Sequence, residues 1–224
     1  NWTQINEGIT SMQIWNIAYV NGALFASSTG GMVFKSTNGG NNWVLSNTGI
    51  SSTTIIRNFA FFNNKIFATS TNKGVYVSSD NGSSWNQHNS GIVGLVAEPL
   101  LVVENDLFVG VNQKVYKYDI TNQNWISKSN GIPNNTVGSL TYISVGVYSL
   151  LGIGTEVFLG NEYGVYKTTN QGLNWVDISG FSNSSPAKFL SKSSTDLYVI
   201  QEAKLWKKSL NSLNVSEVEK GIEN

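Results

Sequence analysis

A glycine followed by a large apolar residue recurs six times along this 224-residue chain, at nearly constant intervals. The steps begin at Gly8, Gly49, Gly91, Gly131, Gly180 and Gly221, so the gaps are 41, 42, 40, 49 and 41 residues. Tryptophans precede five of the steps with the same rhythm, at Trp2, Trp43, Trp85, Trp125 and Trp175. A period of roughly 40–50 residues is typical of repeat architectures built from stacked supersecondary units. We therefore expect the side chains that all repeats share to serve packing, and function to depend on the residues that differ.

Each repeat contains short runs that are rich in β-branched and aromatic residues, and such runs predict strands. The first run of each repeat is the most apolar, which predicts inner strands at 14–20, 55–62, 95–103, 137–143 and 187–190. The fourth run carries the tryptophan and is shorter and more polar. A gradient from buried to exposed strands is expected of a propeller blade, whose inner strand lines the hub and whose outer strand faces water.

The sequence therefore predicts an all-β protein, a five-bladed β-propeller of four-stranded antiparallel blades closed by the N-terminal strand. The repeats are expected at about 10–50, 51–92, 93–132, 133–181 and 182–214, the last of them completed by residues 1–9. Residues 1–214 would then be a single domain and residues 215–224 a C-terminal tail or linker.

Closure by the N-terminal strand is favoured because the fifth repeat has no tryptophan of its own, whereas Trp2 has no preceding strands. The alternative takes Val215 to Ile222 as the fifth outer strand. Trp2 would then belong to an upstream blade, and the chain would be a fragment of a larger propeller.

The fourth repeat is longer than the others, and we predict that Val145 to Gly154 is an insertion between its first and second strands. Two interpretations are open. The segment is either an extended hairpin that packs on the neighbouring blade, or an exposed apolar patch that docks a partner.

Three repeats share an eight-residue turn before the tryptophan, with the pattern Ser/Thr-x-Asp/Asn-x-Gly-x-x-Trp. The residues are Ser36, Asn38, Gly40, Trp43, Ser78, Asp80, Gly82, Trp85, Thr168, Asn170, Gly172 and Trp175. On these turns the chain resembles the Asp-box (BNR) repeat family of β-propellers. An Asp or Asn side chain in a turn accepts hydrogen bonds from nearby backbone amides, and glycine allows a positive φ. The turns are therefore expected to be structural, and in the resembling family they lie away from the ligand face.

The resembling family includes sialidases, sortilin-like receptors, xyloglucan hydrolases and photosystem II assembly factors, so the fold does not determine the function. Sialidases of this family hold the substrate carboxylate with three arginines. This chain has a single arginine, Arg57, so sialidase activity is not expected.

The end of the chain resembles the exit of secreted Bacteroidetes propellers that precede a type IX secretion sorting domain. The resemblance lies in Leu205 to Leu210 followed by Val215 to Glu219. It implies secretion to the medium or to the cell surface.

The composition narrows the choice of function. Formal net charge is zero, so no basic surface for nucleic acid is expected, and no apolar run is long enough for a transmembrane helix. There is no cysteine, and the lone histidine, His88, has no implied metal-binding or catalytic partners. No cofactor or metal is implied, and we expect a monomer.

Candidate binding residues are expected where the repeats differ, near the start of each inner strand and directly after a residue that stays apolar. These positions hold Trp15, Arg57, Glu98, Gly138 and Lys188. Such a set is either a binding surface or a salt-bridged, solvated lining of the central channel. Nearby loops add Glu162 and Tyr163, and also Glu202.

Three functional hypotheses follow. The leading one is a non-catalytic secreted binding or scaffold module that recognises a glycan or a protein at the inner-strand face. The second is a glycoside hydrolase that uses Glu98 together with Glu162 or Glu202, because such enzymes need two carboxyl groups. The third is a structural cell-surface or adhesin segment that binds through Val145 to Gly154.

Overall fold

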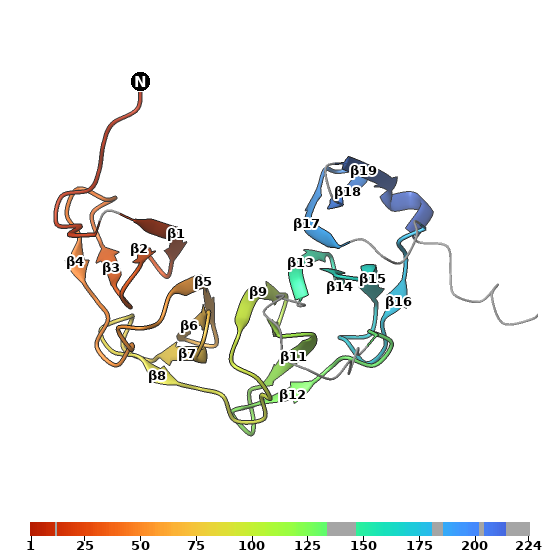
Figure 1. Cartoon of the computed structure of the whole chain (residues 1–224), viewed down its shortest axis with the longest axis horizontal. Helices are drawn as coiled ribbons and strands as arrows, with labels where there is room; N and C mark the ends of the chain where they lie inside the picture. Colours follow the sequence, from red (N-terminus) through yellow and green to blue (C-terminus); the bar gives the residue numbers. More distant parts are fainter. Residues whose placement is uncertain (12, 134–146, 181–185, 202–203, 214–224) are drawn as a thin grey trace, which may run out of the picture.

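The computed structural model describes residues 1–11, 13–133, 147–180, 186–201 and 204–213. These residues form five antiparallel sheets, and in each sheet consecutive strands along the chain are neighbours. The sheets lie side by side along an open arc, with the first strand of each sheet toward the centre (Figure 1). The all-β prediction is confirmed, and the arrangement is that of propeller blades.

The first three blades have four strands each. The first contains β1 (Ile14–Val20), β2 (Ala23–Ser28), β3 (Val33–Ser36) and β4 (Val44–Leu45). The second contains β5 (Ile56–Phe62), β6 (Lys65–Ser70), β7 (Gly74–Ser78) and β8 (Asn86–Gln87). The third contains β9 (Ala97–Val103), β10 (Asp106–Val111), β11 (Lys114–Asp119) and β12 (Asn124–Ser127).

The last two blades differ in completeness. The fourth contains β13 (Val147–Ile153), β14 (Glu156–Asn161), β15 (Gly164–Thr168) and β16 (Val176–Asp177). The described part of the fifth has three strands, β17 (Ala187–Lys192), β18 (Asp196–Gln201) and β19 (Lys204–Ser209), and is followed by the 3₁₀ turn η1 (Leu210–Leu213).

Tight turns join the inner strands to the second strands. The β1–β2 turn is Asn21-Gly22, with φ values of 47° and 81°, and the β5–β6 turn is Asn63-Asn64, with φ values of 48° and 58°. Two consecutive positive φ angles match the two-residue hairpin turn whose twist suits antiparallel strands, and Asn and Gly adopt them at least cost. The local sequence therefore sets the register of these hairpins.

The hydrophobic core is a series of interfaces between successive blades. One cluster joins Phe25 and Val33 of the first blade to Ile56 and Trp85 of the second, and the next interfaces repeat this arrangement. The second strands are the most buried because their own sheet flanks them on both edges and a blade covers each face.

The prediction that inner strands are the most buried is wrong. In β5 and β9 most residues are only half-buried, because these strands border the open centre of the arc.

The periodic glycines and tryptophans form the connections between blades. The backbone N–H of Trp85 donates to the carbonyl of Thr48 (2.8 Å), and its indole N–H donates to the carbonyl of Ser46 (2.8 Å). Gly49 follows with a φ of 90°, and the Trp85 carbonyl lies against its α-carbon, where a side chain would clash. Only glycine fits such a position, which explains why the step recurs.

The predicted closure of the ring is not seen. Within the described residues 1–11 no strand is formed, Trp2 is fully exposed, and the first and fifth blades lie at opposite ends of the arc (Figure 1). The N-terminal segment is instead held against the first blade, where the indole N–H of Trp43 donates to the Ile5 carbonyl (2.7 Å). The segment from Val215 onward, the alternative fifth outer strand, lies outside the described residues.

The prediction for the fourth repeat is also corrected. Its inner strand is β13, not the segment 137–143, which lies outside the described residues. Most of the apolar segment that we interpreted as an insertion is therefore the inner strand itself. Leu150 packs on the third-to-fourth blade core, and Leu151 and Ile153 pack on the fourth-to-fifth blade core, so the strand is not an exposed apolar hairpin.

Candidate ligand-binding site

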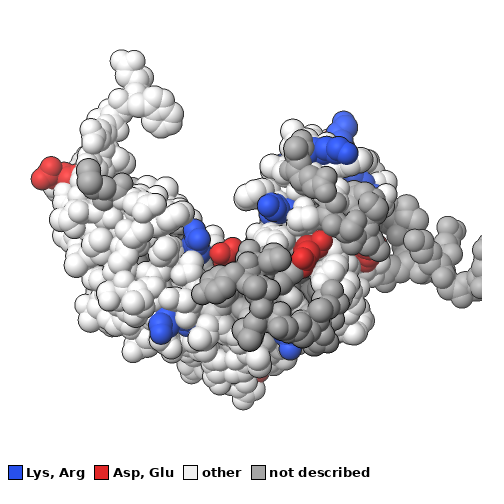
Figure 2. Space-filling model, viewed as in Figure 1, with Lys and Arg blue, Asp and Glu red and all other residues white. Residues whose placement is uncertain are grey.

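A cavity of about 430 Å³ opens at the concave side of the arc. Its lining comes from the inner strands of all five blades: Trp15, Arg57, Asn58, Glu98, Pro99, Leu100, Tyr148, Ser149, Leu150 and Phe189. Basic and acidic side chains meet along the hollow inner edge, whereas most of the other visible surface is uncharged (Figure 2).

An irregularity in strand pairing places the key side chains at this site. In β1, Ile14 pairs with Ser28 and Asn16 pairs with Ser27, so Trp15 is an extra residue. The same one-residue bulge leaves Arg57 extra in β5 and Tyr148 extra in β13. A bulge changes the direction of a side chain and is common beside functional sites.

The two remaining inner strands have the same irregularity. Lys188 is the extra residue of β17, and in β9 the extra residue falls between Ala97 and Leu100, at Glu98 or Pro99. Every blade thus presents one bulged residue at an equivalent position, and the five are chemically different. The strand positions of Trp15, Arg57, Glu98 and Lys188 are those that we predicted from the sequence.

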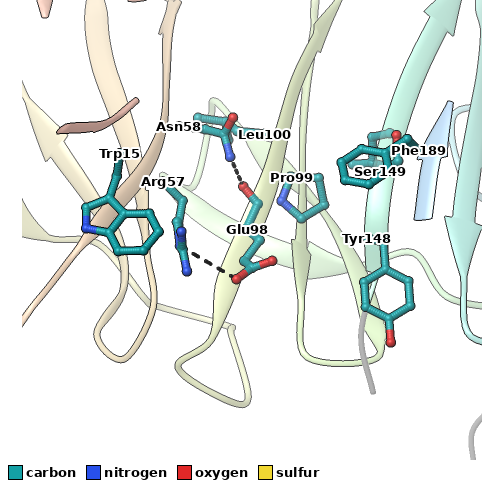
Figure 3. Close-up of a pocket in the computed structure, with 10 residues that line it drawn as sticks. Trp15, Arg57, Asn58, Glu98, Pro99, Leu100, Tyr148, Ser149 and Phe189 are labelled. Carbon is teal, nitrogen blue, oxygen red and sulfur yellow. Dashed lines mark hydrogen bonds and ion pairs between the residues drawn. The ribbon is translucent and has the colours of Figure 1, made fainter. Parts of the chain in front are cut away.

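Arg57 lies between an aromatic ring and a carboxylate. Its guanidinium carbon is 4.9 Å from the centre of the Trp15 ring, and its Nε is 3.8 Å from Glu98 Oε1 (Figure 3). The side chains of Arg57 and Glu98 are 33% and 43% exposed, so a ligand can reach both. Arg57 Nε is itself buried and makes no hydrogen bond within the described structure, so it faces the Glu98 carboxylate only as part of the ion pair.

The backbone of Glu98 is held in place from the preceding blade. Its carbonyl accepts a hydrogen bond from Thr69 Oγ1 (2.9 Å) and another from the amide of Asn58 (Figure 3). The bulge of β9 is therefore fixed across the blade interface, so its carboxylate projects from a rigid base.

Tyr148 occupies the position that the sequence assigned to Gly138. Burial raises the pKa of its phenol, and the negative charges of Glu162 and Glu98 raise it further. The phenol therefore stays protonated and presents a hydroxyl beside two carboxylates. Glu162 is close enough to act on Tyr148, although it does not line the cavity.

The structure separates the other predicted residues from this cavity. Lys188 is exposed on β17 but is not part of the lining, where its neighbour Phe189 stands instead. Tyr163 packs on the core between the third and fourth blades. Gly138 and Glu202 lie outside the described residues.

Sequence reasoning missed Tyr148 and Phe189. Tyr148 was missed because the long fourth repeat was aligned on the wrong apolar run. The signal that identifies the correct run is the two-residue turn Gly154-Thr155, which joins β13 to β14 as Asn21-Gly22 joins β1 to β2.

The three eight-residue turns join the third and fourth strands of the first, second and fourth blades, and none of their residues lines the cavity. All three have the same hydrogen-bond pattern. In the second blade Ser78 Oγ donates to Asp80 Oδ1 (2.7 Å) and accepts from the Gly82 amide (2.8 Å), while Asp80 Oδ1 accepts from the Ser84 amide (2.9 Å). The hydroxyl of Ser84 also donates to the Asp80 carboxylate, and this bond and that from the Ser84 amide have the largest effect in lowering the pKa of Asp80 to about 2, while the bond from Ser78 adds to it. The other turns make the equivalent bonds with Asn in place of Asp: Ser36–Asn38–Gly40–Asn42 and Thr168–Asn170–Gly172–Asn174.

Comparison with known proteins identifies the class of fold. No protein-family model and no curated protein matches the sequence. Among solved structures, the extracellular domain of a one-component system from B. thetaiotaomicron aligns with a TM-score of 0.72 at 13% identity, over 91% of this chain and 28% of that one. YCF48 bound to a D1 peptide aligns with a TM-score of 0.61 at 18% identity, over 93% and 68%.

The GH74 xyloglucanase of Xanthomonas campestris aligns with a TM-score of 0.63 at 12% identity, over 88% of this chain and 36% of the enzyme. At these identities the likeness shows the fold alone, which is that of a β-propeller. The chain spans less than a third of the B. thetaiotaomicron domain and about two thirds of YCF48. In the described part of the chain, no helix has the length and hydrophobicity needed to cross a bilayer.

Proposed function

We propose that this protein is a non-catalytic extracellular binding module that recognises a glycan at the inner-strand face. The observation that carries the proposal is the row of bulged residues, one from each blade, which are equivalent in position but different in chemistry. Residues that only maintain the fold are repeated from blade to blade. Residues that differ at an exposed and structurally fixed position are those expected to recognise a ligand.

The chemistry of the cavity suits a sugar. Trp15 and Phe189 are 43% and 63% exposed and lie toward opposite ends of the lining, where their ring faces can stack on the C–H faces of pyranose rings. Between them, Arg57 and Glu98 offer a donor and an acceptor for hydroxyl groups. A few polar groups set among aromatic surfaces are the usual composition of a small-molecule site.

The neighbouring structures support an extracellular binding role. They include extracellular domains of B. thetaiotaomicron signalling systems and a xyloglucanase. Together with the resemblance of the chain end to secreted propellers, they support our proposal that the protein is secreted or displayed at the cell surface.

Hydrolysis by two carboxylates is less well supported. Among the described residues, the cavity lining contains one carboxylate, Glu98, which faces Arg57, and Glu162 is outside the lining. The adhesin hypothesis relied on an exposed apolar hairpin, and the described part of that segment is the half-buried strand β13.

We also propose that residues 1–214 form one domain in which the N-terminal strand completes the fifth blade. The support is that the described part of the fifth sheet has three strands, whereas each of the other sheets has four.

A glycan array probed with the purified protein tests the function. We expect neutral or mildly acidic oligosaccharides to bind, and the double variant Trp15→Ala/Arg57→Ala to lose binding while its thermal unfolding is unchanged. Val44→Ala is the matched control, because Val44 is an exposed apolar residue on the outer strand β4. Binding that survives in the double variant, or hits confined to a peptide array, would contradict the proposal.

A further inference from the structure

The loop that leads into the inner strand of the third blade is apolar, unlike its counterparts. Its sequence is Val93-Gly94-Leu95-Val96, and we call it the apolar loop. In the equivalent segments of three other repeats Ser, Thr, Asn and Gln predominate; these are residues 10–13, 51–55 and 182–186. Because binding residues are often carried on loops above a repeated scaffold, a loop that departs from its counterparts is a candidate for recognition.

The aliphatic side chains of the apolar loop face water. Val93, Leu95 and Val96 are 71%, 49% and 43% exposed. Single exposed aliphatic residues are common on protein surfaces and need no explanation, but three within four consecutive residues form a patch. Packing within the chain does not account for this patch.

The backbone of the apolar loop follows the same path as the loop of the second repeat. The Leu95 carbonyl accepts a hydrogen bond from the Gly74 amide (2.7 Å). The Thr54 carbonyl accepts the equivalent bond from the Gly31 amide (2.8 Å). Thr54 is fully buried, whereas Leu95 is half-exposed. The two loops therefore share a backbone arrangement and differ in the side chains that they present.

Further hydrogen bonds hold the apolar loop in place. The Val93 amide donates to the Tyr116 hydroxyl (3.2 Å), which donates to the Val93 carbonyl (3.3 Å). The Val96 amide donates to Asn112 Oδ1 (3.2 Å), and the Val96 carbonyl accepts from the Asn112 amide (2.9 Å). These bonds use most of the backbone donors and acceptors of the loop. What the loop offers to a partner is therefore a fixed aliphatic surface.

The apolar loop lies beside the cavity of the inner-strand face, although its side chains are outside the lining. Val96 is two residues before Glu98, so their α-carbons are at most about 7 Å apart. Asn112, which holds Val96, also accepts a hydrogen bond at its carbonyl from the Val147 amide (2.8 Å), and Val147 precedes Tyr148. A ligand that fills the cavity and extends past Glu98 can therefore reach the loop.

The size and chemistry of the patch favour a hydrocarbon chain over a protein. A stable protein–protein interface buries about 800 Å² on each partner, far more than three aliphatic side chains provide. A peptide that binds as an added strand needs free backbone groups, and the loop uses most of its own internally. An alkyl or acyl chain needs neither, because its burial is favourable in proportion to the apolar area covered.

We propose that the apolar loop is a subsite for the hydrocarbon part of an amphiphilic glycan whose sugar part occupies the cavity. The ligand class of the inner-strand face is then a glycan that carries an alkyl or acyl chain. The sugar contacts Trp15 and Glu98, and the chain leaves past Glu98 to cover Val93 and Leu95. This inference rests on the glycan binding proposed above.

Methyl and octyl β-D-glucopyranoside test the proposal as a matched pair, with the octyl glucoside kept below its critical micelle concentration. Binding is followed by NMR through the indole N–H signal of Trp15 and the backbone amide signals of Val93, Leu95 and Val96. We expect the octyl glucoside to shift both sets of signals along one saturation curve. It should bind at least about tenfold more tightly than the methyl glucoside, because covering about two methylene groups has an effect of that size.

Two double variants locate the effect. Val93→Ser/Leu95→Thr removes the patch and introduces residue types of the second-repeat loop, in which Thr54 makes the same backbone bond as Leu95. We expect this variant to bind the two glucosides with equal affinity. Val44→Ser/Leu45→Thr is the matched control, because these are exposed aliphatic residues on β4, and it should keep the preference for the octyl glucoside.

Several results would overturn the proposal. The octyl glucoside could leave the loop signals unmoved, its preference could survive in the loop variant, or the loop signals could move while that of Trp15 does not. Binding to sugar-free phosphatidylcholine vesicles that is lost in the loop variant would also overturn it, because the loop would then bind a lipid surface without a glycan.

The glycan array keeps this inference separate from the proposed function. Intact binding on the array without a preference for the octyl glucoside rejects the hydrocarbon subsite alone. Absence of any binding on the array rejects the glycan-binding function, and the subsite with it.

Discussion

The guanidinium of Arg57 lies over the indole ring of Trp15, with 4.9 Å between Cζ and the ring centre. The two residues are bulged positions on the inner strands of adjacent blades, so their contact exists only because the blades pack side by side. A cation over an aromatic face at an exposed site is worth about 0.5–1 kcal/mol.

A double-mutant cycle at these two positions measures that contact. Trp15→Ala and Arg57→Ala should each lower the free energy of unfolding by less than about 1 kcal/mol, because both side chains are partly exposed at the open centre of the arc. The coupling energy from urea unfolding should fall at about 0.5–1 kcal/mol. A coupling of zero would mean that the two side chains do not stack in solution.

The buried tryptophans should behave very differently. Trp85 is 1% exposed and its indole N–H donates to the Ser46 carbonyl, so Trp85→Phe removes buried volume and leaves a carbonyl without a partner. We expect a loss of roughly 2–4 kcal/mol in the free energy of unfolding. Trp15→Phe is the control and should cost less than about 1 kcal/mol, because the Trp15 side chain is half-exposed. Equal losses would show that Trp85 does not join the blades.

The glycine steps can be tested at Gly49. Alanine there must adopt a φ of 90° and would clash with the Trp85 carbonyl, so Gly49→Ala should cost more than about 3 kcal/mol. Gly22 also has a positive φ, 81°, but has no atom within 4 Å of an added side-chain carbon. Gly22→Ala should therefore cost only about 1 kcal/mol. Thermal unfolding of the two variants separates the two effects, because Gly22→Ala introduces only backbone strain whereas Gly49→Ala adds a steric clash. A similar loss of stability in both variants would contradict the role of Gly49.

The single histidine gives a prediction for pH. His88 packs against the rings of Phe67 and Tyr118, and burial lowers its pKa below the ordinary 6.5, with a further contribution from the charge of Lys65. Below about pH 6.5 the unfolded chain binds a proton at His88 that the folded protein does not bind, so the free energy of unfolding decreases as pH falls towards the lowered pKa.

His88→Phe keeps a ring at the position and removes the proton site. Its free energy of unfolding should be flat in the window just below pH 6.5, where that of the natural protein falls. The loss caused by Asp80 occurs at lower pH, since its pKa falls from 3.8 to about 2, and both proteins should share it. The same slope in both proteins just below pH 6.5 would rule out burial of His88 as its cause.

The repeat rhythm was enough to predict the sheets, because the steps at Gly8, Gly49, Gly91 and Gly131 each place a glycine against the carbonyl of the next tryptophan in the series, where a side chain would clash. The inner-strand positions of Trp15, Arg57 and Glu98 followed from the same alignment. The fourth blade could not be placed in this way, because its long repeat contains two apolar runs and periodicity alone does not choose between them. The bulges that set the direction of these side chains could not be predicted from the sequence either. A bulge is a shift in the pairing between the inner strand and the second strand, and the residue pattern of one strand alone does not show it.

Ring closure shows a different limit. The sequence indicates that the fifth repeat has no tryptophan of its own and that Trp2 has no preceding strands, but it does not give the angle between neighbouring blades. That angle arises from the packing of whole interfaces, and in the structure it leaves the ends of the arc apart (Figure 1).

Glycan binding at the inner-strand face can be observed through the indole N–H signals of the seven tryptophans, followed by NMR during titration with the best oligosaccharide from the array. We expect the Trp15 signal to shift in proportion to occupancy, while the signals of the buried Trp43, Trp85, Trp125 and Trp175 stay in place. Saturable binding that leaves the Trp15 signal unchanged would contradict this expectation.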